Sequence, residues 1–119
     1  MLLNAFVNVS SSVDEVFYCG DHANAVTVRQ GRGRRPLDSR GDLRKHSSDG
    51  FTWGDGRDGQ AQLSLALLAD ALQDDQRALD LYQEFATRVV TTFPDRWIIS
   101  RARVRAHADR IDQRCFAMH

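Results

Sequence analysis

Apolar and polar positions follow one period in the first part of the chain and another in the second. The stretch EVFYCGD, residues 15–21, is rich in β-branched and aromatic residues, as strands are. The stretch AVTVRQ, residues 25–30, alternates apolar and polar positions like a half-buried strand. The residues between them, Asp21 to Asn24, favour a turn. We therefore expect a β-hairpin.

The alternation ends after this hairpin. Two glycines and a proline in GRGRRPL predict a mobile loop or linker from Gly31 to Pro36. Residues 37–53, LDSRGDLRKHSSDGFTW, have no helical period and predict irregular structure. Phe51 and Trp53 stand two positions apart, so they share a face of an extended segment and are expected to anchor it to the core.

A helical period begins near Gly59. The stretch GQAQLSLALLADAL, residues 59–72, is apolar on nearly every side, which is typical of a buried central helix. Asp74 is placed to cap a second helix, whose apolar stripe repeats every 3.6 residues from Ala78 to Phe93. Pro94 is expected to end that helix.

The last part of the chain predicts one more helix. RWIIS, residues 96–100, is either a short strand or an extended connector, and its Trp97 is a third expected anchor. Ser100 is a suitable N-cap for the helix that follows. Its apolar stripe consists of Val104, Ala108, Ile111 and Cys115.

These elements predict an α+β fold, in which a small N-terminal antiparallel sheet or hairpin packs with two to three C-terminal helices. We assign residues 16–119 to a single domain and residues 1–15 to an N-terminal extension, either ordered as a short strand or disordered. MLLNAFVNV, which opens the chain, lacks the basic region and cleavage site of a signal peptide. We therefore expect a cytoplasmic protein with no membrane partner, in which Cys19 and Cys115 are reduced.

Charge is balanced overall but uneven along the chain. Sixteen lysines and arginines match sixteen aspartates and glutamates. Basic residues gather between Arg29 and Lys45, and acidic residues gather between Asp70 and Glu84. We expect the two segments to neutralise each other. The alternative is a nucleic-acid or phosphate contact, made by Arg32, Arg34, Arg35 and Arg40.

The stretch HSSDGFTWGDGRDG, residues 46–59, comes directly before the apolar helix. A helix N-terminus has unpaired N–H groups that suit an anion, and Gly54 and Gly56 would let the backbone approach one. However, Asp55 and Asp58 repel an anion, and the stretch lacks the lysine of a phosphate loop. We favour a structural turn and keep the anion site as the alternative.

Other chemistry has weaker support. The aspartates of this loop lack the spacing of a calcium loop, and the histidines and cysteines lack that of a zinc site. Trp53 and Trp97 would suit base stacking, but a role in the core is favoured. We therefore predict no metal, no cofactor and no catalytic residue.

Several motifs together resemble a small bacterial family. They are Tyr18-Cys19-Gly20, Arg35-Pro36-Leu37, Asp49-Gly50-Phe51, Trp53-Gly54 and Ala61-Gln62-Leu63. The family is defined only as a domain of unknown function, and it occurs on bacterial chromosomes, plasmids and phages. The chain departs from the family pattern at Ser48 and Gln60, where proline is usual, and at Asp55, where tyrosine is usual.

Small size and the lack of a catalytic constellation favour a non-enzymatic interaction module with a protein partner. The distribution that the resemblance implies favours a phage or plasmid accessory that acts on a host protein. The first alternative is a nucleic-acid or phosphate binder that uses Arg29 to Lys45, with or without the third helix, and the second is an enzyme that uses the glycine loop.

Overall fold

The computed structural model describes residues 15–21, 24–48, 50–54 and 56–117, with side chains as far as residue 113. The extension expected over residues 1–15 therefore lies, except for Glu15, outside the described residues. The side chain of Cys115, the last member of the predicted stripe of the third helix, also lies outside them.

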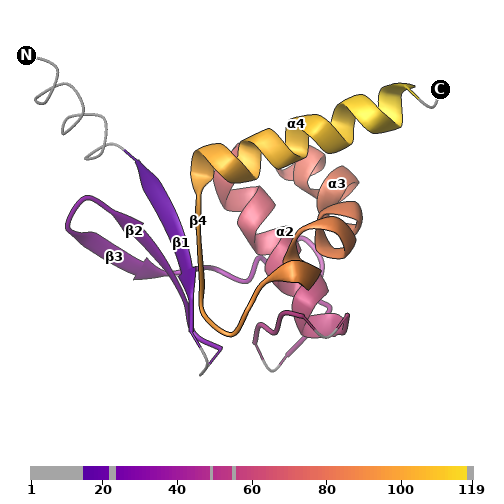
Figure 1. The fold of residues 1–119 in the computed structure, drawn as a ribbon. Coiled ribbons are helices and arrows are strands. Elements are labelled where there is room, and N and C mark those ends of the chain that lie inside the picture. Colours follow the sequence, from indigo (N-terminus) through magenta and orange to yellow (C-terminus); the bar gives the residue numbers. More distant parts are fainter. Residues whose placement is uncertain (1–14, 22–23, 49, 55, 118–119) are drawn as a thin grey trace, which may run out of the picture.

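The described part of the chain forms a four-stranded sheet and three helices, which confirms the α+β fold (Figure 1). The strands are β1 (Val16–Gly20), β2 (Val26–Gln30), β3 (Gly33–Pro36) and β4 (Trp97–Ser100), in the order β3-β2-β1-β4. Every neighbouring pair is antiparallel. RWIIS is thus a strand, and it completes the sheet from the far end of the chain.

The prediction of a loop from Gly31 to Pro36 is wrong, because β3 occupies most of that segment. Gln30 pairs with Gly33, so Gly31 and Arg32 form a tight turn between β2 and β3. Gly31 has a φ of 58°, a value that glycine adopts without strain. Pro36 is the last residue of β3, an edge strand, where its missing N–H is tolerated. The glycines and the proline that interrupt the alternating pattern of the sequence therefore belong to a second hairpin, formed by β2 and β3.

The helices are α2 (Asp58–Leu72), α3 (Asp75–Arg88) and α4 (Arg101–Ala117). Both predicted N-caps are confirmed. The backbone N–H of Arg77 donates to Asp74 Oδ1 at 3.1 Å, and that of Arg103 donates to Ser100 Oγ at 3.0 Å. None of the described helices is long and apolar enough to cross a membrane.

The second helix ends earlier than the apolar stripe predicts. α3 stops at Arg88, and the 3-10 turn η1 (Val90–Thr92) follows it. Residues 89–92 are all β-branched, and such side chains lose rotamer freedom in a helix, which disfavours its continuation. The apolar stripe continues through this change because Val89 and Val90 are both buried.

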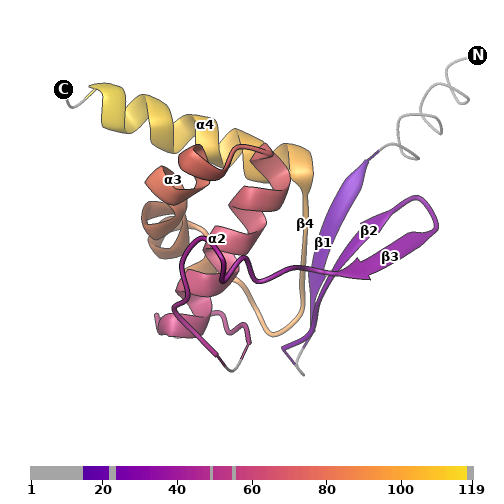
Figure 2. The same cartoon turned by 180° about the vertical axis from the view of Figure 1, so that it is seen from behind.

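The three helices lie on one face of the sheet, with α2 in the centre, and no described element covers the other face (Figures 1 and 2). From Leu63 to Ala69 every residue of α2 is buried, as expected of a central helix. The core side of the sheet contributes Val16, Tyr18, Val26 and Val28. The segment between β3 and α2 crosses α2 on the side seen in Figure 2.

Candidate functional site

The glycine turn before α2 is held by one glutamine of that helix. Gly54 and Gly56 have φ values of 79° and 68°, so both require the freedom of glycine. Their backbone N–H groups donate to Gln60 Oε1 at 2.9 and 3.1 Å. Gln60 Nε2 donates in turn to the carbonyl of Ala86 at 3.1 Å. The two amides on which an anion site at Gly54 and Gly56 would depend thus already have an acceptor.

A second glutamine fixes the segment before this turn. Gln62 is fully buried, and its Oε1 accepts from the N–H groups of His46 and Ser47 at 2.6 and 3.2 Å. Its Nε2 donates to the carbonyls of Ser39 and Arg44 at 2.7 and 3.0 Å. Both polar atoms of a buried amide are therefore satisfied, as burial requires. Gln62 belongs to the Ala-Gln-Leu motif of the family resemblance.

The expected anchors all lie in or against the core. Phe51 and Trp97 are 9% and 7% exposed, and Trp53 is partly buried. Trp53 meets Trp97 edge to face at 5.6 Å between ring centroids, and Phe93 lies 4.5 Å from Trp97. The indole of Trp97 lies over Gly20, where a Cβ would overlap it. These rings fix the entry to α2 against the sheet and offer no open platform for a base.

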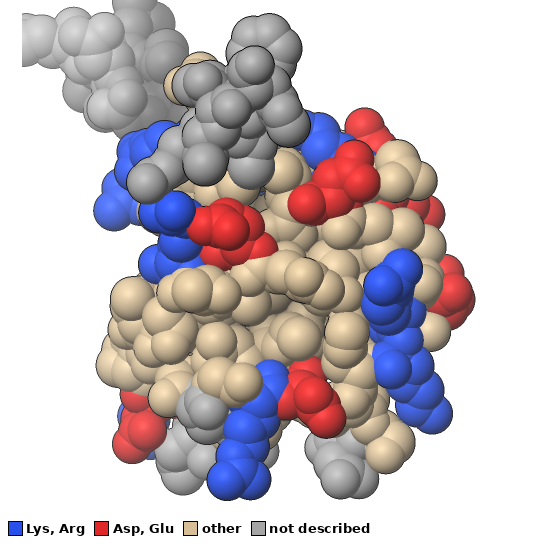
Figure 3. Space-filling model, turned by 90° about the vertical axis from the view of Figure 1, so that its right-hand side faces the viewer, with Lys and Arg blue, Asp and Glu red and all other residues tan. Residues whose placement is uncertain are grey.

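The arginines of the basic segment from Arg29 to Lys45 point in different directions and do not form one surface. Arg35 Nη2 lies 2.7 Å from Asp70 Oδ1, and Arg40 bonds both Asp42 and Asp75. Neighbouring strand residues point to opposite faces, so Arg34 lies on the other side of the sheet from Arg35, opposite Arg29. Arg32 is exposed in the β2–β3 turn. The expected neutralisation thus takes place at Arg35 and Arg40. On the face shown in Figure 3, acidic and basic side chains are interspersed around an uncharged centre.

Asp70 is the centre of a network that joins the sheet to two helices. Tyr18, which is fully buried, donates its hydroxyl to Asp70 Oδ2 at 2.6 Å. Arg101 Nη2 lies 3.4 Å from the same oxygen, and Arg35 holds the other. Burial alone would raise the pKa of Asp70, but the hydrogen bonds and charges of these partners outweigh it, and the pKa lies below its ordinary value. Asp70 is therefore an ionised structural carboxylate.

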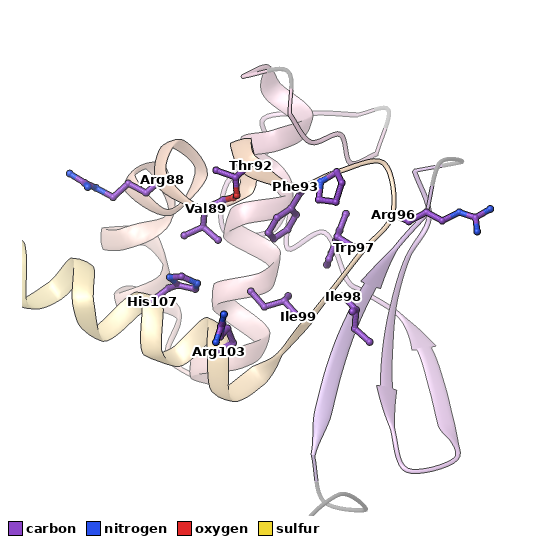
Figure 4. A pocket seen from close by; sticks show the side chains of 11 residues that line it. Arg88, Val89, Thr92, Phe93, Arg96, Trp97, Ile98, Ile99, Arg103 and His107 are labelled. Atoms are coloured by element: carbon purple, nitrogen blue, oxygen red, sulfur yellow. The ribbon is translucent and has the colours of Figure 1, made fainter.

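A groove of about 620 Å³ with an apolar floor lies along β4. Its walls are β4, the end of α3 with η1, and the first two turns of α4 (Figure 4). Val89, Phe93 and Ile99 supply apolar surface. Ile98, whose side chain is 61% exposed, stands at its margin. We define the β4 groove by these elements.

The rim of the β4 groove is basic. Arg88, Arg96 and Arg103 belong to its lining, in which none of the described residues is an aspartate or glutamate, but Arg88 is paired with Glu84 one turn earlier on α3. In Figure 4 Arg88 and Arg96 extend outward at opposite ends. His107 also lines the groove, but burial and the charges of Arg110 and Arg103 lower its pKa, which favours a neutral imidazole. The positive charge of the rim therefore comes from arginine.

Ile98 and His107 were not expected from the sequence to belong to a site, and Arg103 was considered only as part of a helix that contacts nucleic acid. One signal was present in Trp97-Ile98-Ile99, three consecutive large apolar residues. If this segment is a strand, Ile98 must face away from Trp97 and Ile99, so one large apolar side chain leaves the core. The arginines of the rim carry no such signal, because they come from α3, the η1–β4 connection and α4. Among the described residues, no cluster of three His, Cys, Asp or Glu side chains suits a metal ion.

The fold and its buried polar network define a small α+β domain built around one central helix. The family of unknown function DUF6166 matches residues 18–110, so the chain belongs to this family. This match confirms the resemblance drawn from the motifs, and it includes Tyr18, Gly20, Arg35 and Gln62. No curated protein and no solved structure matches the chain.

Proposed function

We propose that this protein is a small, non-enzymatic interaction module that binds a partner protein through the β4 groove. The supporting observation is Ile98, the large hydrophobic side chain that remains exposed among the described residues, beside an apolar groove with a charged rim. Apolar surface rimmed by polar groups is typical of protein contacts. Arginine and aromatic residues, which this groove combines, are enriched at such contacts. The occurrence of the family on plasmids and phages, as the resemblance implies, favours a host protein as the partner.

Nucleic-acid binding is the second candidate, and one observation favours it. Arg29 and Arg34 are exposed and lie directly opposite each other on the face of the sheet that the helices leave uncovered. However, Arg35 and Arg40 are bound to carboxylates, so the segment offers fewer free charges than its sequence indicates. Affinity for nucleic acid depends on the number of phosphates neutralised. We therefore rank this function below protein binding.

The test replaces Ile98 with a photo-crosslinking amino acid in the native host. A protein that contacts the groove is expected to form a covalent adduct, which mass spectrometry identifies. The matched control carries the same probe at Asp80, an exposed position on α3 outside the groove. Adducts at position 98 and not at position 80 support the proposal. Equal labelling at the two positions, or no protein adduct at either, contradicts it.

A further inference from the structure

We infer that the partner enters the β4 groove as an extended, acidic segment that pairs with the free edge of β4 and becomes a fifth strand of the sheet. This inference rests on the proposed function and specifies the chemistry of the partner. It combines three observations, which concern the edge of the sheet, the apolar floor of the groove and the charge of its rim.

β4 is an edge strand with backbone available for pairing. Among the described residues it pairs with β1 alone, which leaves one side of the strand without a neighbour in the sheet. Four consecutive residues, 96–99, line the groove. Their side chains alternate between the two faces, so the groove follows the backbone edge itself. Such an edge is a template for an added strand.

The other edge of the sheet suits this role less. β3 has the sequence GRRP, and all four of its residues are exposed. Pro36 lacks an N–H group, and charged side chains together with proline discourage pairing at an edge. The apolar groove lies along β4, not along β3. The structure thus directs an incoming strand to β4.

The floor of the groove supplies contacts for alternate side chains. An added strand points every second residue to the same face. Phe93 and Ile99, which are partly buried, offer apolar surface on the groove side, and Ile98 offers it on the opposite face. β4 is four residues long, which corresponds to roughly 13 Å of paired strand. A partner with apolar residues at alternate positions fits this geometry.

The rim selects for negative charge. Arg103 is exposed and lines the groove near the start of α4, and no carboxylate among the described residues lines it. An aspartate or glutamate beside the apolar positions of the partner would meet this guanidinium group. Complementary charge of this kind contributes specificity and speeds association.

Two other occupants fit the groove less well. β4 of a second copy has the sequence WIIS, which carries no acidic residue and so would not supply the negative charge that Arg103 favours. A nucleic acid would need open rings for stacking, but Trp97, the largest ring of the groove, is only 7% exposed. A heterologous acidic peptide remains as the occupant that the groove fits.

The first experiment selects a random peptide library displayed on phage against the full-length protein. Peptides that bind the variant Arg103→Glu are removed. We expect the remaining peptides to be enriched in aspartate and glutamate that alternate with aliphatic residues. No enrichment, or enrichment of basic peptides, overturns the inference.

The second experiment measures binding of one selected peptide by fluorescence anisotropy. N-methylation of alternate backbone nitrogens in one register should weaken binding about tenfold or more, because it removes the pairing donors. The opposite register places the methyl groups away from β4 and should bind nearly as well as the parent peptide. Equal effects of the two registers would exclude strand addition.

Protein variants locate the binding site. Arg103→Ala should weaken binding of the selected peptide roughly fivefold, and the matched control Arg34→Ala, at the other edge of the sheet, should leave it unchanged. Circular dichroism confirms that both variants fold. An equal loss in the two variants, or competition by a single-stranded oligonucleotide, overturns the inference. If a probe at Ile98 captures a host protein while the peptide tests fail, strand addition is wrong and the proposed function stands. If both fail, both are wrong.

Discussion

Tyr18 and Gly20 are neighbours on the same face of β1 and have different roles in the packing of the core. Both lie on the core side of β1, where Tyr18 fills space and carries a hydroxyl to Asp70. Gly20 contributes no side chain, and the indole of Trp97 takes the space above it. The tyrosine-x-glycine motif therefore specifies one position with a large side chain and one position without a side chain, which leaves room for the Trp97 indole. A sequence shows the residue types, but not that a tryptophan 77 positions later packs over the glycine.

Gly20→Ala should destabilise the protein by about 1–3 kcal/mol, because the new methyl group displaces the Trp97 indole from a closely packed position. Urea unfolding measures this as a lower midpoint. The matched control is Gly41→Ala, where the nearest atom to a new Cβ lies 3.7 Å away and the change should stay within about 0.5 kcal/mol. Equal midpoints for the two variants would show that Trp97 adapts without cost.

α2 acts as a scaffold for two irregular segments, in addition to filling the core. Gln60 and Gln62 are two positions apart on a helix and so point to nearly opposite sides. One holds the glycine turn and the other holds the segment from Ser39 to Ser47. The apolar pattern predicted a buried helix but gave these glutamines no role, because a polar residue in such a pattern looks like a gap in the stripe. Their partners come from loops that no periodicity describes.

Gln62→Ala should loosen the segment from Ser39 to Ser47 while the rest of the protein stays folded. The amides of His46 and Ser47 lose their acceptor, so their hydrogen exchange should become faster than that of the α2 backbone. The variant should also lose roughly 2–4 kcal/mol of stability, because four backbone groups are left without this partner. Gln76→Ala, an exposed glutamine on α3, provides the comparison. Unchanged exchange at His46 and Ser47 would contradict this account.

Sequence patterns predicted the elements that depend on local periodicity and local hydrogen bonds. These include β1, β2, the central helix and the caps at Asp74 and Ser100. They failed at β3, where glycines that make a tight turn looked like a linker. They also could not place the β4 groove, because its walls meet only when β4 pairs with a strand from the opposite end of the chain. The attraction between the basic and acidic segments could be predicted from the sequence because it depends on the signs of the charges and not on an exact arrangement of the side chains.

Across the whole molecule, Asp70 joins elements that are distant in sequence. Its carboxylate receives Tyr18 from β1, Arg35 from β3 and Arg101 from α4. The side chain of Asp70 is 13% exposed, whereas that of Arg35 is 51% exposed, so the contact with Tyr18 counts for more than this ion pair. The network holds the sheet against the helices at one point. Its position inside an apolar helix is the sequence signal that identifies it.

Asp70→Ala should cost about 2–3 kcal/mol, because it leaves the hydroxyl of the fully buried Tyr18 without its carboxylate acceptor. Thermal and urea unfolding both report the loss. Asp80→Ala removes an exposed aspartate from α3 and should change stability by less than about 0.5 kcal/mol. A double variant, Asp70→Ala with Tyr18→Phe, should recover part of the loss because the orphaned hydroxyl is gone. No recovery would assign the effect to the arginines instead.

The position of β1 between β2 and β4 has a consequence for synthesis on the ribosome. β2 follows β1 closely in the sequence. β4 comes much later: Arg101, the first residue after β4, contacts Tyr18 of β1 and lies 83 residues after it. At an elongation rate of about 5–20 residues per second, several seconds pass between the synthesis of β1 and that of β4, and one edge of β1 is unpaired during this time. During that interval the nascent chain exposes the same kind of pairing surface that β4 offers in the finished fold. A chaperone that shields exposed strands therefore has its main opportunity before residue 100 emerges, and a stop codon before β4 should yield an aggregation-prone fragment.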